Sequence, residues 1–121
     1  MTLPFRRLPI DPAEGFPQSF RLSLEDRTYE FQLYANVTEE LVDAASTGPL
    51  DLPRKGAFLV LSIAREEPTG LVTIFRRKLV PNLEYAVAEL AVVFRTMRLD
   101  RRNLNGVGAF GSDVVGGVAL R

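Results

Sequence analysis

Two neighbouring stretches alternate apolar and polar residues, and together they predict a β-hairpin. The period of two runs over 18–24 and again over 28–33, with a short polar turn between them. The apolar positions are Phe20, Leu22, Leu24, Tyr29, Phe31 and Leu33. Because alternate residues of a strand share a face, we expect these side chains to form one buried face.

The middle of the chain predicts a second pair of strands. Residues 57–64 form an apolar run with Ser62 as its one polar residue, which is typical of a strand that is covered on both faces or lies at a packed interface. Pro68 and Gly70 mark a turn, and 71–79 supplies the returning strand. The stretch 35–53 contains Gly48, Pro49 and Pro53, and we interpret it as a loop.

The C-terminal third is ambiguous between helix and strand. Leu83, Ala86, Val87, Leu90 and Phe94 fall at helical spacings, whereas the β-branched and aromatic residues of 90–99 favour a strand. We therefore expect a short helix or turn over 82–88 and a strand over 90–99. A closing strand is expected over 114–120, with a bulge or bend at its paired glycines, 116 and 117.

These elements predict a mainly β chain: one small β-barrel or sandwich of about five to seven strands. The prolines at 4, 9, 12 and 17 predict that residues 1–18 form an extended arm apart from the packed fold. Residues 19–121 then form a single β domain, which suits a chain of 121 residues.

Composition narrows the possible chemistry. The chain has no histidine and no cysteine, so His-dependent triads, thiolate sites and His-built zinc sites are excluded. The carboxylate pairs at 39–40 and 66–67 lack the convergence that acid–base catalysis needs. We therefore expect no enzyme activity, no cofactor and no metal. No signal peptide or membrane-spanning helix is expected either.

A glycine-rich run, Gly106-Val107-Gly108-Ala109-Phe110-Gly111, matches the G-x-G-x-x-G pattern of dinucleotide-binding loops. That use requires a following helix and an acidic residue about twenty positions on, but only ten residues follow Gly111. We interpret the run as a loop whose backbone takes positive φ or passes close to another chain.

Arginine dominates the basic residues, supplying thirteen of the fifteen, although the net charge is zero. Four arginines lie along or just after the end of a predicted strand and could form a stripe: Arg95, Arg98, Arg101 and Arg102. They could contact nucleic-acid phosphates, or they could form salt bridges within a protein interface. Zero net charge and the lack of an aromatic platform beside this stripe favour the interface.

Several segments together resemble the small plug or hub-type baseplate proteins of tailed bacteriophages. The resemblance rests on the hairpin that ends in Tyr34-Ala35-Asn36, on LVTIFRRKLVPNLEY, on LAVVFRTMRLD and on the terminal NLNGVGAFGSDVVGGVAL. It implies a compact β domain near the tail axis, assembled in the host cytoplasm and located in the virion. It also implies contacts in several copies with other tail and baseplate proteins, with nucleic acid only in transit through the tail, and no catalysis.

The leading hypothesis is therefore a structural component of a phage tail baseplate. The alternative is a small β-barrel that binds nucleic acid through its arginine-rich strand. The candidate interface residues are Phe5, Arg6, Arg7, Arg95, Arg98, Arg101, Arg102, Gly106, Gly108, Phe110 and Gly111.

Overall fold

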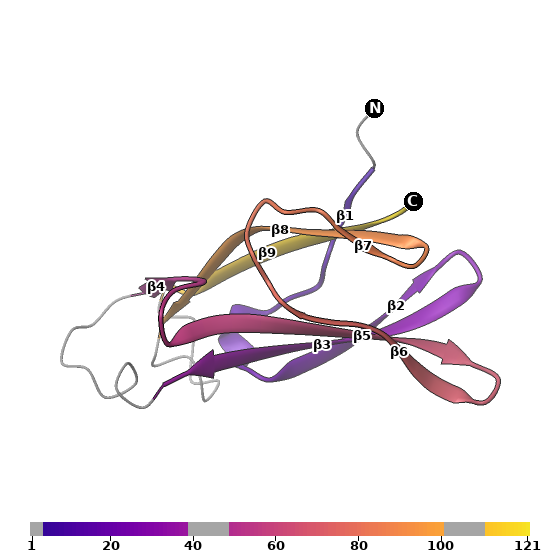
Figure 1. The fold of residues 1–121 in the computed structure, drawn as a ribbon, viewed down its shortest axis with the longest axis horizontal. Helices are drawn as coiled ribbons and strands as arrows, with labels where there is room; N and C mark the ends of the chain where they lie inside the picture. Colours follow the sequence, from indigo (N-terminus) through magenta and orange to yellow (C-terminus); the bar gives the residue numbers. More distant parts are fainter. Residues whose placement is uncertain (1–3, 39–48, 101–110) are drawn as a thin grey trace.

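The chain folds into two antiparallel β-sheets that lie one above the other (Figure 1). The computed structural model describes residues 4–38, 49–100 and 111–121. The arrangement is a sandwich, and the strands of the described residues form no closed barrel. The predicted mainly β fold class is confirmed, and of the predicted barrel and sandwich the structure shows the sandwich.

The first sheet has four strands in the order β2-β3-β5-β6. These strands are β2 (Gln18–Leu24), β3 (Arg27–Val37), β5 (Ala57–Glu67) and β6 (Gly70–Lys78). The predicted hairpin is confirmed, with Phe20 opposite Phe31 and their rings stacked at a centroid distance of 5.3 Å. Alternation places Tyr29, Phe31 and Leu33 on the buried face, as expected from the period of two.

Strand β5 lies inside this sheet, between β3 and β6. Its odd-numbered residues from Ala57 to Ile63 are fully buried between the sheets. Its even-numbered residues from Phe58 to Ala64 are only half-buried. The strand is therefore confirmed. Of its two predicted settings, cover on both faces does not hold, because no second layer packs on the outer face among the described residues, and a packed interface stays a prediction.

The second sheet has five strands, built around the pair β8 and β9. They are β1 (Arg6–Arg7), β4 (Pro49–Asp51), β7 (Tyr85–Val87), β8 (Leu90–Asp100) and β9 (Asp113–Leu120). The described residues form nine strands, more than the five to seven expected, and six of them have seven residues or more. The three short ones, β1, β4 and β7, were not predicted.

Of the short helix or turn expected over 82–88, the structure shows turns at both ends of a short strand and no helix. The chain turns at Asn82, where φ is 63°, and then forms β7, which pairs with the start of β8. A second turn at Ala88, with φ of 50°, joins the two strands. Helical spacing misled here because the apolar residues of a tight hairpin can also fall three and four apart.

The predicted loop over 35–53 is partly wrong. Strand β3 continues to Val37, and Pro49–Asp51 forms β4, which pairs with the end of β8. Residues 39–48 lie outside the described part of the chain.

The predicted irregularity near the paired glycines is confirmed, and the extra residue lies on the neighbouring strand. Phe94 pairs with Gly116 and Thr96 with Val115, so Arg95 is unpaired in a β-bulge of β8. A Cβ added to Gly116 would lie 2.8 Å from the Phe94 ring. Glycine is therefore required so that the ring can lie against β9.

The N-terminal segment is extended, but it is packed on the sandwich. Arg6 and Arg7 pair with β9, and Leu8 is only 2% exposed within the core. A 3-10 turn, η1 (Pro12–Glu14), leads to Phe16, which is also buried. The expectation that this segment lies apart from the packed fold does not hold, because Leu8 and Phe16 add apolar surface to the core.

Candidate functional site

The structure places the predicted interface residues at separate positions. Arg6 and Arg7 are exposed on β1, one margin of the five-stranded sheet, and Phe5 precedes them. Arg98 is also exposed, but it pairs with Asp51 of β4 at the other margin, with Nε and Oδ1 3.1 Å apart. These residues therefore do not form one surface.

The arginine stripe is engaged with polar partners where the structure describes it. Arg95 donates to the Asn82 side chain at 3.3 Å, and Arg98 donates to Asp51. Arg101, Arg102, Gly106, Gly108 and Phe110 lie outside the described residues. Gly111 has φ of 89°, and a Cβ added there would lie 2.9 Å from the Pro49 side chain. Gly111 thus has the positive φ that was expected of the glycine run.

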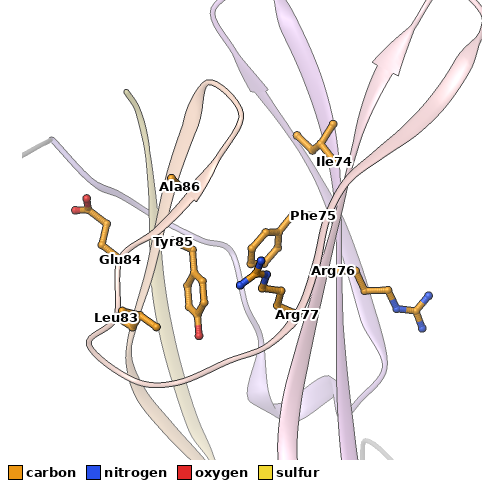
Figure 2. Close-up of a pocket in the computed structure, with 8 residues that line it drawn as sticks. All are labelled: Ile74, Phe75, Arg76, Arg77, Leu83, Glu84, Tyr85 and Ala86. Atoms are coloured by element: carbon orange, nitrogen blue, oxygen red, sulfur yellow. The ribbon is translucent and has the colours of Figure 1, made fainter.

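A groove opens along the margin where β6 faces β7, and the sequence did not predict it. It has a volume of about 480 Å³. Its floor is the pair Phe75 and Tyr85, whose rings lie edge to face with their centroids 5.5 Å apart. Figure 2 shows these two side chains pointing toward each other. Its lining residues are Ile74, Phe75, Arg76, Arg77, Leu83, Glu84, Tyr85 and Ala86. We call this hollow the β6 groove.

Tyr85 fixes one wall of the β6 groove. Its hydroxyl accepts a hydrogen bond from the Val80 amide at 2.8 Å and donates to the Lys78 carbonyl at 3.3 Å. These bonds hold the connection between β6 and β7 against the end of β6. The wall is therefore held by the Tyr85 hydroxyl, which is bonded to two backbone groups.

The backbone of β6 borders this groove as the edge of the four-stranded sheet. An edge strand presents N–H and C=O groups that can pair with another chain. Two features restrict such pairing: a bulge at Ile74 and the three successive cations Arg76, Arg77 and Lys78. Figure 2 shows that Arg76 points away from the groove, whereas Arg77 lies beside Phe75.

Apolar side chains remain exposed along β6 and the connection after it, and of these Leu83 lines the β6 groove. Among the described residues, the exposed large hydrophobic side chains all come from β6 or the connection that follows it. They are Leu71 at 50%, Val72 at 44%, Val80 at 42% and Leu83 at 48% exposure. Such a concentration on one margin is typical of a surface that another protein covers.

A charged cluster joins the two sheets at the β7–β8 turn. Glu89 lies on this turn and accepts hydrogen bonds from the Tyr29 hydroxyl, from Arg27 at 3.0 Å and from Arg65 at 2.8 and 3.0 Å. Arg65 also pairs with Glu67. We call Arg27, Tyr29, Arg65, Glu67 and Glu89 the interlayer cluster.

The interlayer cluster shifts the pKa values of its members. Partial burial alone would raise the pKa of Glu89, but hydrogen bonds from Tyr29, its own backbone, Arg65 and Arg27 lower it to about 2. Burial, together with the hydrogen bond to Glu89 and the charge of that residue, raises the pKa of Tyr29 to about 12. A carboxylate held in this way is ionised and saturated with donors, so it ties the sheets together rather than acting as a base.

The other acidic pairs do not converge on a site. Glu66 and Glu67 follow each other on β5, where neighbouring residues point to opposite faces. Glu39 and Glu40 lie outside the described residues. Within the described ranges, no group of three or more Asp or Glu residues could hold a metal ion, and no helix is long and apolar enough to cross a membrane.

Sequence reasoning missed both the β6 groove and the interlayer cluster. One signal was present for the cluster, because Glu89 is the single charge in the apolar stretch from Tyr85 to Phe94. A lone charge among apolar residues indicates a paired group at a buried margin. The groove depends on the packing of β6 against β7, which no local pattern encodes.

Comparisons with known proteins add no relative. No protein-family model, no curated protein and no solved structure matches this chain.

Proposed function

We propose that this chain is a structural subunit without catalytic activity, which docks on other proteins through β6 and the β6 groove. The main support is that the exposed large apolar side chains of the described residues all lie on one edge strand or the connection that follows it: Leu71, Val72, Val80 and Leu83. A partner segment beside β6 would cover these side chains, and it could pair with the backbone of β6 ahead of the Ile74 bulge and the cations that follow it. The aromatic floor of the groove offers an anchoring point, and aromatic residues are enriched where interfaces are strongest.

The assembly proposed is the tail baseplate of a tailed bacteriophage. The basis for this assignment is the sequence resemblance to small plug or hub-type baseplate proteins. An edge strand flanked by exposed apolar side chains suits a subunit that neighbours complete. The lack of histidine and cysteine, and the saturated state of Glu89, favour a structural role over an enzymatic one.

Docking through β6 can be tested by co-expressing the chain with the tail tube and hub proteins of the phage that encodes it. We expect co-elution on size exclusion, and an affinity that falls about tenfold or more when Val72→Glu and Leu83→Glu are combined. The matched control combines Ser19→Glu and Ser23→Glu on β2, the opposite edge of the same sheet, and should bind as the wild type does. An equal loss in both variants would contradict docking at β6.

The assignment to a baseplate has its own test. Mass spectrometry of intact, DNA-packed virions should detect the chain in several copies. Its absence from such particles would remove the baseplate assignment, even if docking through β6 were real.

A further inference from the structure

The outer face of the four-stranded sheet carries two aromatic rings on adjacent strands. Tyr34 of β3 pairs with Val60 of β5, and Val60 pairs in turn with Lys78 of β6, so these three side chains share one row on one face. Phe58 and Arg76 lie on the same face, each one row from Val60. We call Tyr34, Phe58, Val60, Arg76 and Lys78 the Tyr34 face.

Each ring of the Tyr34 face lies beneath a cation. The Arg76 guanidinium lies 5.8 Å from the centre of the Tyr34 ring, and the Lys78 ammonium lies 4.7 Å from the centre of the Phe58 ring. Both cations are exposed, whereas the two rings are half-buried. The face therefore offers paired planar and positive groups to the solvent.

The Tyr34 side chain stands between two hollows. One has a volume of about 410 Å³ and is lined by Tyr34, Asn36, Val60 and Arg76, among others. The other, of about 210 Å³, is lined partly by Gln32 and Tyr34. Planar ligand groups could thus contact Tyr34 from two sides, with the exposed Asn36 amide nearby to bond to their edges, while the Gln32 amide is bonded to Glu30 and Tyr34.

Charge decides which class of ligand suits this face. Neither ring has a carboxylate among its paired neighbours on the outer face. Glu30 lies on this face but further along β3, and it pairs with Arg21 at 3.6 Å. A ligand that combines planar rings with regularly spaced negative charge fits, and a neutral glycan would leave Arg76 and Lys78 without partners.

We propose that the Tyr34 face binds single-stranded nucleic acid, with bases that stack on Tyr34 and Phe58 in place of the two cations, and phosphates held by the displaced Arg76 and Lys78. Base–aromatic stacking with flanking cations is a general way to hold single strands without sequence preference. Duplex DNA would not bind in this way, because its bases are already stacked and cannot reach the rings. This site is separate from the arginine stripe of β8, where Arg95 and Arg98 already have polar partners.

The proposal can be tested with a fluorescein-labelled oligothymidylate of about twelve nucleotides, by anisotropy titration of the full chain. Two phosphate contacts give a salt slope of about −1.4, so affinity should fall about sevenfold between about 50 and about 200 mM NaCl. Lys78→Gln should reduce that fall to about threefold, because one contact is lost. Tyr34→Leu should weaken binding about tenfold, whereas Tyr34→Phe should retain it because the ring remains.

The control is the double variant Arg95→Gln with Arg98→Gln, which removes two charges from β8 and should leave oligonucleotide binding unchanged. Circular dichroism and the thermal midpoint verify that each variant is folded. The proposal is overturned if the oligothymidylate does not bind at low salt, if Tyr34→Leu binds as the wild type does, or if the β8 double variant loses binding. Equal affinity for duplex DNA, or tighter binding of a neutral oligosaccharide, would overturn it as well.

Discussion

The interlayer cluster leads to a quantitative prediction about Glu89. The substitution Glu89→Gln keeps the size of the side chain but removes the charge that Arg27, Arg65 and Tyr29 share. A pKa lowered from 4.5 to about 2 corresponds to roughly 3 kcal/mol of stabilisation. The Glu89 side chain is 29% exposed and that of Arg27 is 57% exposed, so water screens part of this. We therefore expect Glu89→Gln to lower the free energy of unfolding by about 1–2 kcal/mol at pH 7.

The pH dependence gives the same prediction an independent measurement. Because the folded-state pKa of Glu89 lies below its ordinary value, its contribution is complete above about pH 4.5 and is lost as the pH falls towards 2. The difference in stability between the wild type and Glu89→Gln should therefore be largest at neutral pH. It should shrink by about half near pH 3.

Urea unfolding monitored by circular dichroism measures the loss of unfolding free energy at pH 7 and its change with pH. The matched control is Glu66→Gln, which removes the same charge from an exposed position on β5 and should change stability by no more than about 0.5 kcal/mol. If Glu89→Gln is as stable as the wild type at pH 7, the cluster does not hold the sheets together. A loss that stays constant from pH 7 to about pH 2 would refute the electrostatic explanation.

Three further predictions test the packing of the core and the hydrogen bond between Tyr29 and Glu89. Gly116→Ala should cost about 1–3 kcal/mol in unfolding free energy, because the new Cβ meets the Phe94 ring, and combining it with Phe94→Leu should recover part of that loss. Leu8→Ala should cost about 2–4 kcal/mol if the N-terminal segment belongs to the core, and no measurable loss would place it outside the core. In an alkaline titration at 295 nm, the tyrosine transition that Tyr29→Phe removes should lie near pH 12, and a midpoint near 10 would contradict its hydrogen bond to Glu89.

The sequence predicted the long strands well because their stability depends on local alternation. The period of two in 18–33 located β2 and β3, and Pro68 with Gly70 located the turn between β5 and β6. It failed for β7, where Asn82 and Ala88 adopt positive φ without a glycine to signal the turn. That conformation is unfavourable for alanine by about 1–2 kcal/mol, so contacts from distant parts of the chain must hold it. Local propensity alone could not predict these contacts.

The contacts that hold the Ala88 turn also connect the interlayer cluster to the β6 groove. Arg121 donates to the carbonyls of Ala88 and Glu89 at 2.8 and 2.9 Å, while the Glu89 carboxylate is fixed by the opposite sheet. At the other end of β7, Tyr85 is bonded to the connection that leaves β6. Strand β7 is only three residues long, so these two anchors determine where the wall of the groove lies. Glu89→Gln should therefore weaken partner binding at the β6 groove even though Glu89 does not line it. It should leave oligonucleotide binding at the Tyr34 face unchanged. That face lies on the outer side of the four-stranded sheet, whereas Glu89 lies between the two sheets.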